Sequence, residues 1–157
     1  MTTDILAFVR ESNRIEGIIR EATPQECQAT EEFISADTLT IVRVKALVAV
    51  LQPNARIRDR AGLNVRVGSH IAPLGGPEIV DALEDILEFV PVYEPYWTHH
   101  QYETLHPFTD GNGRSGRAIW LWQMIRCGGG APLGFLHHWY YQSLQARRAS
   151  PSGERGP

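Results

Sequence analysis

The first residues of the chain combine apolar and polar positions at the spacing of one helix face. The positions on this face are Ile5, Phe8, Ser12, Glu16 and Ile19. Side chains three or four residues apart lie on the same side of an α-helix, so the pattern predicts a helix over residues 4–19. Ser12 and Glu16 would then face inward. Because a charged side chain on an inward face needs a partner, we expect Glu16 to pair with a cation.

Helical spacing continues along most of the chain, and local signals mark the helix ends. Thr23 is a predicted N-cap followed by a proline at the first helical position, and Pro53 and Pro91 each stop a helix. We expect helices over residues 23–35, 38–51, 77–90, 93–105, 113–127 and 133–146. The inward positions of the helix over 93–105 would be Tyr93, Tyr96, Trp97 and Leu105. The helix over 113–127 is apolar on nearly all sides, which is typical of a central, buried helix.

One segment follows the two-residue period of a β-strand. Val65 and Val67 alternate with polar residues, and Gly62 and Gly68 offer turn positions. The predicted fold class is therefore mainly α, with one small β-hairpin over residues 62–72. The tail over residues 147–157 is rich in Ser, Pro, Gly and charge, and we expect it to be disordered.

The composition predicts one domain, over residues 1–146, without a nucleic-acid or membrane partner. The 157 residues are 43% hydrophobic and 21% charged, and a net charge of −3 disfavours broad binding to nucleic acid. No uncharged apolar run approaches ~18 residues, and the start lacks the basic region of a signal peptide. Cys27 and Cys127 form no disulfide or metal-binding pattern, which fits a reducing compartment. We therefore expect a cytoplasmic protein.

The densest chemistry lies in residues 106–117, which read H-P-F-T-D-G-N-G-R-S-G-R. His106 is the residue in this stretch whose unperturbed pKa lies near neutrality, as a general base requires. Asp110 offers a hard carboxylate oxygen for Mg²⁺, which usually binds one or two carboxylates together with substrate phosphates. A base and a metal ligand would thus lie close together.

The second half of this stretch suits an anion. Gly111 and Gly113 leave the backbone bare, so that consecutive N–H groups can form a nest for an anion. A helix that begins near Gly113 would add the positive end of its dipole. Arg114 and Arg117 would share one face of that helix, and their guanidinium groups suit phosphate oxygens.

Residues 106–117 resemble the signature of the Fic family, H-P-F-x-D/E-G-N-G-R-x-x-R, without a mismatch. The resemblance covers roughly residues 4–146 and implies a helical core with a β-hairpin flap beside the active-site loop. It also implies a protein adenylyltransferase, an enzyme that transfers AMP from ATP to a Tyr, Thr or Ser hydroxyl of a target protein. Mg²⁺ is the implied cofactor, and ATP and the target protein are the implied partners. Whether the protein forms a homodimer stays open.

The resemblance implies a role for each matched position. His106 would take the proton of the target hydroxyl, and Asp110 would hold Mg²⁺. The nucleotide would be bound by Gly111, Asn112, Gly113, Arg114 and Arg117. The flap would bind the backbone of the target as an added strand, through Val65, Val67 and Ile71.

A second motif lies near the start of the chain. Residues 12–17, S-N-R-I-E-G, resemble the inhibitory motif of the Fic family, S/T-x-x-x-E-G/N, in the N-terminal position of its class II. In that comparison Ser12, Glu16 and Gly17 are inhibitory residues, and Glu16 would hold Arg117 away from the γ-phosphate of ATP. Glycine is unfavourable inside a helix, so we expect Gly17 to be required by close packing.

Three other functions are open to the same residues. Glu16 could position a water that removes AMP from a modified protein. The related Doc toxins act as kinases, but they have Ala and Lys where this chain has Gly111 and Gly113. A catalytically silent binding module is disfavoured by the intact His106 and Asp110.

Two further polar groups are interpreted as structural. His99, His100 and Glu103 lack the spacing of a metal site, so they are expected to be packing or surface residues. The arginines Arg56, Arg58 and Arg60 are expected to form a solvated face.

Overall fold

The computed structural model describes residues 4–92 and 94–127. In this part the fold is mainly α, as predicted, with helices α1 (Ile5–Ile15), α2 (Pro24–Ile34), α3 (Ile41–Leu51), α4 (Pro77–Phe89), α5 (Pro95–Leu105) and α6 (Asn112–Arg126). Strands β1 (Arg66–Val67) and β2 (His70–Ile71) form an antiparallel hairpin between α3 and α4. None of these helices has the length and apolar character needed to cross a membrane. The predicted helix over 133–146 and the predicted disordered tail lie outside the described residues.

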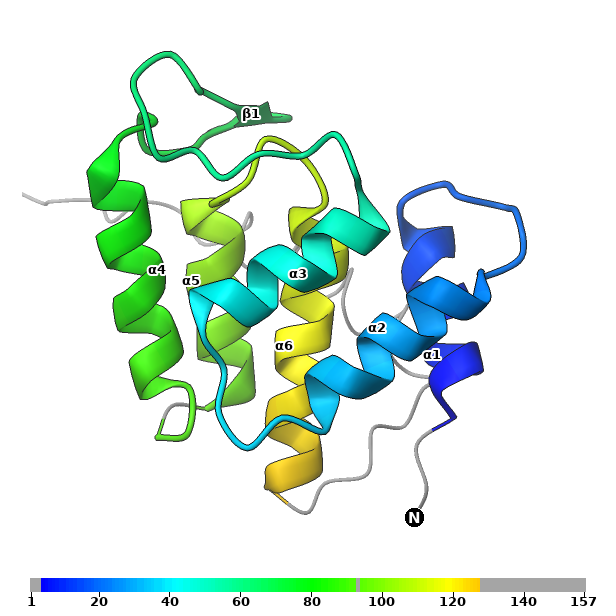
Figure 1. Ribbon diagram of the computed structural model, residues 1–157. Helices are drawn as coiled ribbons and strands as arrows, with labels where there is room; N and C mark the ends of the chain where they lie inside the picture. The colour runs from blue at the N-terminus through cyan, green and yellow to red at the C-terminus, as the bar shows by residue number, and fades with distance from the viewer. Residues whose placement is uncertain (1–3, 93, 128–157) are drawn as a thin grey trace, which may run out of the picture.

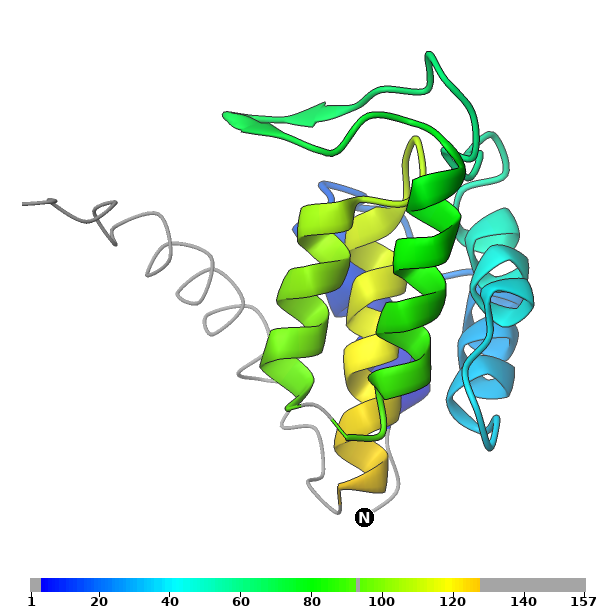
Figure 2. The ribbon, with the colours of Figure 1, turned by 90° about the vertical axis from the view of Figure 1, so that its left-hand side faces the viewer.

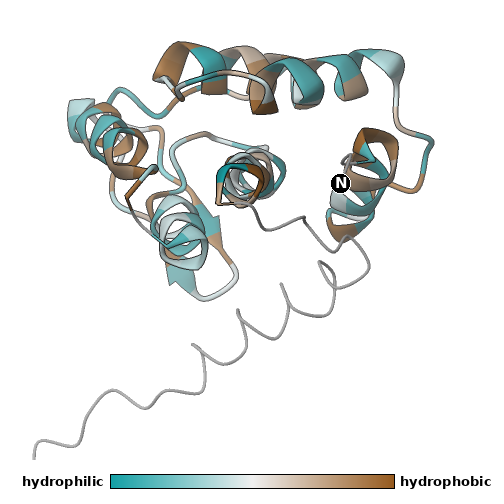
Figure 3. Ribbon diagram, turned by 90° about the horizontal axis from the view of Figure 1, so that it is seen from below, coloured by the Kyte–Doolittle hydropathy of each residue, from teal (hydrophilic) through white to brown (hydrophobic). Residues whose placement is uncertain are grey.

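Helix α6 lies at the centre of the fold. In Figure 1, α4 and α5 lie on one side of it, α1 and α2 on the other, and α3 crosses in front. Figure 3 shows α6 end-on among the other helices. Residues 114–123 are all buried, so the predicted central helix is confirmed. Its polar side chains find partners there: Trp122 donates to the Ala36 carbonyl (2.7 Å) and Gln123 to the Val90 carbonyl (2.6 Å).

Capping residues set the starts of the helices. The Thr23 hydroxyl accepts from the Glu26 N–H (3.1 Å), and the Glu26 carboxylate accepts from the Thr23 N–H (2.8 Å), so the predicted N-cap of α2 is confirmed and forms a capping box with Glu26. At α5 the carboxylate of Glu94 caps the helix, which therefore begins at Pro95. The buried face of α5 consists of Thr98, His99, Tyr102 and Leu105, whereas Trp97 is 38% exposed. The prediction that Trp97 faces inward is wrong, because polar side chains occupy part of the inward stripe.

Helix α1 ends at Ile15, earlier than the predicted boundary at residue 19. The N–H groups of Gly17 and Ile18 donate back to the carbonyls of Arg14 and Asn13, a Schellman arrangement in which Gly17 has φ 75°. A Cβ on Gly17 would meet nothing within 4 Å, so the expected close packing is wrong and the reason for glycine is its left-handed backbone. Beyond this turn Ile19 is 95% exposed, because it no longer belongs to the helix face.

The hairpin lies over the end of the bundle where α5 ends and α6 begins (Figure 2). The chain just before it runs antiparallel to the loop between these helices. Ile57 forms a β-bridge with Phe108, the Arg58 N–H donates to the Pro107 carbonyl (2.9 Å), and the Thr109 N–H donates to the Arg56 carbonyl (2.9 Å). The segment that leads to the hairpin is therefore joined to the signature loop through the backbone.

Candidate active site

His106 follows the last residue of α5 in a left-handed conformation, with φ 50° and ψ 62°. Its N–H still closes the helix by donating to the Tyr102 carbonyl (2.9 Å), while its ring Nδ1 lies 3.3 Å from the Glu103 carbonyl oxygen. Burial lowers the pKa of His106 below its ordinary value. This shift favours the neutral imidazole, which is the state that a general base requires.

Arg58 holds the backbone at this point, and its expected place on a solvated face is wrong. The side chain is 0% exposed, and its guanidinium donates to the carbonyls of His106 (2.7 Å), Leu105 (2.7 Å), Pro73 (2.7 Å) and Leu63 (3.2 Å). Two of these carbonyls end α5, where no helical donor reaches them, and two lie at the ends of the hairpin segment. The four carbonyl oxygens all point to the Arg58 side chain, and a planar guanidinium has enough N–H donors to serve each of them.

The signature loop is closed by its own asparagine. Asn112 is 2% exposed, and its amide accepts from the Phe108 N–H (2.9 Å) and donates to the Phe108 carbonyl (2.8 Å). Phe108 is itself buried at 2% exposure and anchors the loop in the core. The Asn112 side chain thus shapes the loop. The first-turn N–H groups of α6, which have no intrahelical acceptor, are the donors available to an anion.

Asp110 and Arg114 meet at one side chain that the sequence did not single out. Gln52, at the C-terminal end of α3, donates from Nε2 to Asp110 Oδ2 (2.7 Å) and accepts at Oε1 from Arg114 Nη2 (2.8 Å). Asp110 Oδ1 accepts from the Gly111 N–H (2.6 Å). The expected metal ligand and an expected phosphate-binding arginine are therefore tied to the same amide.

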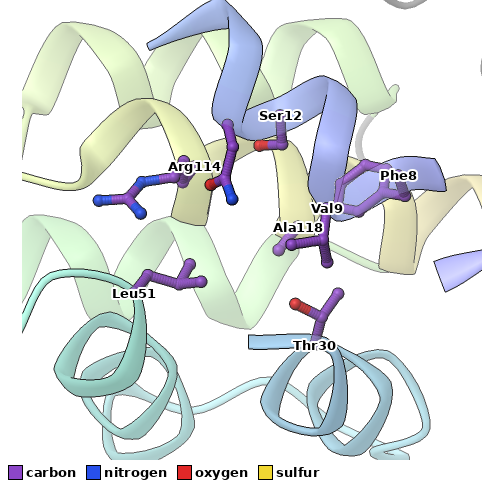
Figure 4. Close-up of a pocket in the computed structure, with 8 residues that line it drawn as sticks. Phe8, Val9, Ser12, Thr30, Leu51, Arg114 and Ala118 are labelled. Carbon is purple, nitrogen blue, oxygen red and sulfur yellow. The ribbon is translucent and has the colours of Figure 1, made fainter. Parts of the chain in front are cut away.

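Arg114 is 5% exposed, and its charge is balanced from α2. Its Nη1 lies 3.8 Å from Glu26 Oε1. Arg20 also pairs with Glu26 (2.8 Å) and holds the pKa of that carboxyl at about 2. A cavity of about 10 Å³, lined by Arg114, Ser12 and Thr30 among others, lies between α1, α2, α3 and α6 (Figure 4).

Arg117 binds the end of α1. Its Nη2 lies 2.6 Å from Glu16 Oε1, so the predicted contact between Glu16 and Arg117 is present. Ser12 adds two contacts, because its hydroxyl accepts from Arg117 Nε (2.9 Å) and its carbonyl from Nη2 (2.9 Å). Arg117 is buried, but 38% of the Glu16 side chain is exposed, since Glu16 caps the end of α1 instead of lying within it. The expected inward glutamate is thus at the protein surface.

The Glu16 carboxylate lies in the space left by the missing side chain of Gly113. A Cβ at Gly113 would lie 2.2 Å from Glu16 Oε1, which is less than any real contact. Gly113 is in the first turn of α6, where the helix dipole favours negative charge. The carboxylate of Glu16 therefore lies at the start of α6, beside the residues for which the sequence predicts an anion site.

The residues of the hairpin are accessible. Val67 is 42% exposed and Ile71 is 68% exposed, whereas Val65 is half-buried. His70 Nε2 lies 2.9 Å from the Thr104 carbonyl oxygen, which connects the hairpin to α5. Strand β2 of this short hairpin is therefore placed beside the end of α5 that precedes His106.

Comparison with protein families decides the identity. The model of the Fic/DOC family matches residues 38–124, which include α3, the hairpin and the signature loop. The chain belongs to the Fic/DOC family. Members of this family are typically transferases that act on proteins. No curated protein matches the chain significantly. The match does not include α1, α2 or the residues Glu16 and Glu26.

The residues of this Fic/DOC protein fit Mg²⁺ through one carboxylate. Asp110 is exposed, and among residues 4–92 and 94–127 no group of three or more His, Cys, Asp or Glu side chains could hold a metal by itself. Mg²⁺ normally takes one or two carboxylates and completes its shell with phosphates and water. A metal bound at Asp110 would therefore depend on a phosphate ligand beside the first turn of α6.

Glu103 is a further carboxylate at the site of the Fic/DOC protein. Its Oε2 lies 3.9 Å from His106 Nδ1, and a Cβ at Gly116 would lie 2.5 Å from its Oε1. Burial raises the pKa of Glu103 to about 7, an effect that the charge of Arg117 opposes. The sequence analysis interpreted Glu103 as a packing or surface residue and did not predict that it lies beside His106. The three-residue spacing of Glu103 and His106 in the sequence was the signal that could have predicted it.

The raised pKa of Glu103 predicts a pH-dependent stability. The folded protein holds this proton more tightly than the unfolded chain, whose glutamates titrate near pH ~4.3. The stabilisation is complete below that pH and is lost as the pH rises through about 7. Glu103→Gln keeps a neutral side chain, so we expect it to be more stable than the wild type by ~1–3 kcal/mol at pH 8, with the difference vanishing near pH 4.

Urea unfolding of both proteins at several pH values measures this difference. Glu84→Gln, on the exposed face of α4, is the matched control. Stability curves for Glu103→Gln and wild type that stay parallel between pH 4 and 8 would show that Glu103 titrates normally.

Proposed function

We propose that this Fic/DOC protein is a protein adenylyltransferase that Glu16 holds in an inhibited state. The observation that carries the proposal is the position of the Glu16 carboxylate, which lies against Arg117 and over Gly113 at the start of α6. That position has the donors and the helix dipole of a phosphate site. A carboxylate there competes with a phosphate group of ATP, so that nucleotide would bind without the alignment needed for transfer.

The proposed reaction forms a P–O bond to the target and breaks the bond between the α- and β-phosphates. His106 accepts the proton of the target hydroxyl, whose oxygen attacks the α-phosphorus, and pyrophosphate leaves with the electron pair. The charge on the phosphates would be neutralised by donors of the loop and of α6, which are Gly111, Asn112, Gly113, Arg114 and Arg117. Mg²⁺ at Asp110 would supply further neutralisation. Positioning and electrostatic stabilisation account for the catalysis.

Isotope transfer tests the reaction type. The purified chain is incubated with a cell lysate and with ATP labelled either at the α- or at the γ-phosphate. We expect the α-label on protein and no transfer of the γ-label. Transfer of the γ-label alone would mean a kinase, and transfer of neither label by the wild type or by a Glu16→Gly variant would mean a binding module.

The metal role of Asp110 leads to a binding prediction. Asp110→Ala removes the carboxylate available to a hard cation, so the gain in ATP affinity on adding Mg²⁺ should be lost. Calorimetric titration of ATP with Mg²⁺ and with a chelator measures the gain. Asp59→Ala, beside the exposed Arg60, serves as the control. An unchanged Mg²⁺ dependence in Asp110→Ala would remove this residue from the metal shell.

The exposed hairpin leads to a prediction on target docking. Val67→Pro removes a backbone N–H and obstructs the addition of a strand. We expect transfer to a protein target to fall at least ~10-fold, since a strand-addition interface depends on backbone hydrogen bonds, while ATP affinity stays unchanged. The transfer rate and the ATP affinity are measured on the same preparation of the variant and of the wild type. A parallel loss of ATP binding would show that the hairpin supports the fold and does not dock the target.

A further inference from the structure

Gln52 makes two contacts of opposite polarity within the signature loop. Its amide nitrogen donates to Asp110 Oδ2 (2.7 Å), and its amide oxygen accepts from Arg114 Nη2 (2.8 Å). The side chain of Gln offers a donor and an acceptor on one rigid plane. Glutamate at this position would repel Asp110, and lysine would repel Arg114. The neutral amide therefore suits both contacts.

The backbone around Gln52 is fixed for this contact. Its N–H ends α3 by donating to the Val48 carbonyl (2.7 Å), and its carbonyl accepts from the Ala55 N–H (2.9 Å). On the other side of the contact, a Cβ at Gly111 would lie 3.1 Å from the Cβ of Gln52. Gly111, at φ 77°, thus serves both the left-handed turn and the close approach of Gln52.

Asp110 and Arg114 each contact Gln52 and one further group. Gln52 is the side chain that both of them contact. Asp110 Oδ1 accepts from the Gly111 N–H (2.6 Å), and Arg114 Nη1 lies 3.8 Å from Glu26 Oε1. Asp110, just before α6, and Arg114, in the first turns of α6, carry opposite charges, and without an intervening side chain these charges would attract each other into a salt bridge. A direct salt bridge would occupy the metal ligand with a cation and the phosphate-binding guanidinium with an anion.

We propose that Gln52 is a positioning residue that keeps Asp110 and Arg114 apart and directs one to the metal and the other to a phosphate. This inference rests on the proposed use of Mg²⁺ and ATP by the site. Gln52 takes no part in the reaction. It acts by holding the two charged side chains in the arrangement that bound nucleotide needs, so that little rearrangement is required on binding.

The test compares Gln52→Leu with the wild type in the full chain. Leucine has a similar volume but neither hydrogen bond, and Gln52 lies at the surface end of α3, so the variant should fold. Gln28→Leu is the matched control, because Gln28 is exposed on α2 and also donates to a carboxylate, that of Glu32 (2.9 Å). Thermal unfolding verifies that all three proteins fold.

Two measurements decide the proposal. In calorimetry, Gln52→Leu should bind ATP with Mg²⁺ about tenfold more weakly than the wild type, as expected for lost hydrogen bonds to charged groups. Its affinity with a chelator present should fall less, and Gln28→Leu should match the wild type in both conditions. A crystal structure of Gln52→Leu should contain a salt bridge between Asp110 and Arg114.

Other outcomes overturn the inference. Equal losses of affinity with and without Mg²⁺ would mean that Gln52 does not connect the metal ligand to the arginine. Unchanged positions of Asp110 and Arg114 in the crystal structure of the variant would mean that Gln52 does not hold them apart, whatever the affinities. A wild-type chain that fails to bind ATP with Mg²⁺ would refute the proposed function instead, and the crystal structure would still decide the role of Gln52.

Discussion

Glu16→Gly is expected to raise the transfer of the α-label from ATP to protein by ~100-fold, most visibly as self-modification. Such a rise corresponds to ~2.7 kcal/mol of inhibition. The physical reason is that Glu16 places an anion against Arg117 and over Gly113, where a phosphate group would gain the same donors. Removing the carboxylate opens that position, and Arg117 keeps its contacts with Ser12 and so remains close to its present place.

The variant should fold. Breaking a fully buried ion pair costs ~3–5 kcal/mol, but 38% of the Glu16 side chain is exposed and Ser12 continues to bind the guanidinium, so the cost here is smaller. Glu21→Gly is the matched control, because Glu21 pairs with Arg10 at the surface, away from the signature loop. It should transfer label at the wild-type rate.

A double variant tests the mechanism of the increase. Glu16→Gly combined with Arg117→Ala should lose the gain, since Arg117, once the Glu16 carboxylate is gone, is the group that aligns the phosphates. If Glu16→Gly transfers neither label faster than the wild type, Glu16 is an ordinary salt-bridge residue and the inhibitory role is wrong.

His106→Ala is expected to reduce transfer by ~10²–10⁴-fold, the usual contribution of a general base. The comparison is best made in the Glu16→Gly background, where the starting rate is high. The affinity for ATP with Mg²⁺ should stay at its starting value, because the anion position lies at α6 and not at the ring of His106. His106→Asn is a useful companion, since asparagine tolerates the left-handed backbone of this position and cannot act as the base.

The pH dependence provides a separate check on His106. Its pKa lies below the ordinary histidine value because burial disfavours the charged ring. The rate of transfer in the Glu16→Gly background should therefore stay level from pH 8 down to the ordinary histidine value of ~6.5 and fall only below it. A rate that already falls between pH 8 and 7, or an alanine variant with unchanged activity, would show that another group is the base.

Local spacing was sufficient to predict the helices and the signature loop. The capping box at Thr23 and the all-round apolar pattern of α6 predict their elements, because both depend on residues within one or two turns of each other. The loop between α5 and α6 was predictable for the same reason. Gly111 adopts the left-handed conformation that the sequence analysis allows for a glycine, whereas the left-handed conformation of His106 was not predicted.

Errors in the predicted boundaries came from competition between local patterns. The apolar stripe of α1 extends in the sequence to Ile19, but Gly17 ends the helix first, since its left-handed turn is more favourable than continued helix at a glycine. Similarly, α5 directs Thr98 and His99 inward and leaves Trp97 exposed, because the packing surface of α6 selects the face.

The sequence by itself determined the fold class and the signature residues through patterns with characteristic spacing, and the resemblance to the Fic family implied that Glu16 pairs with Arg117. Only the tertiary structure decided how these residues are held. Gln52 lies 58 residues from Asp110 in the sequence, and Arg58 lies 48 residues from His106. Contacts over such separations arise where packed helices bring chain segments together, and side chains that join them follow no period that a single sequence displays.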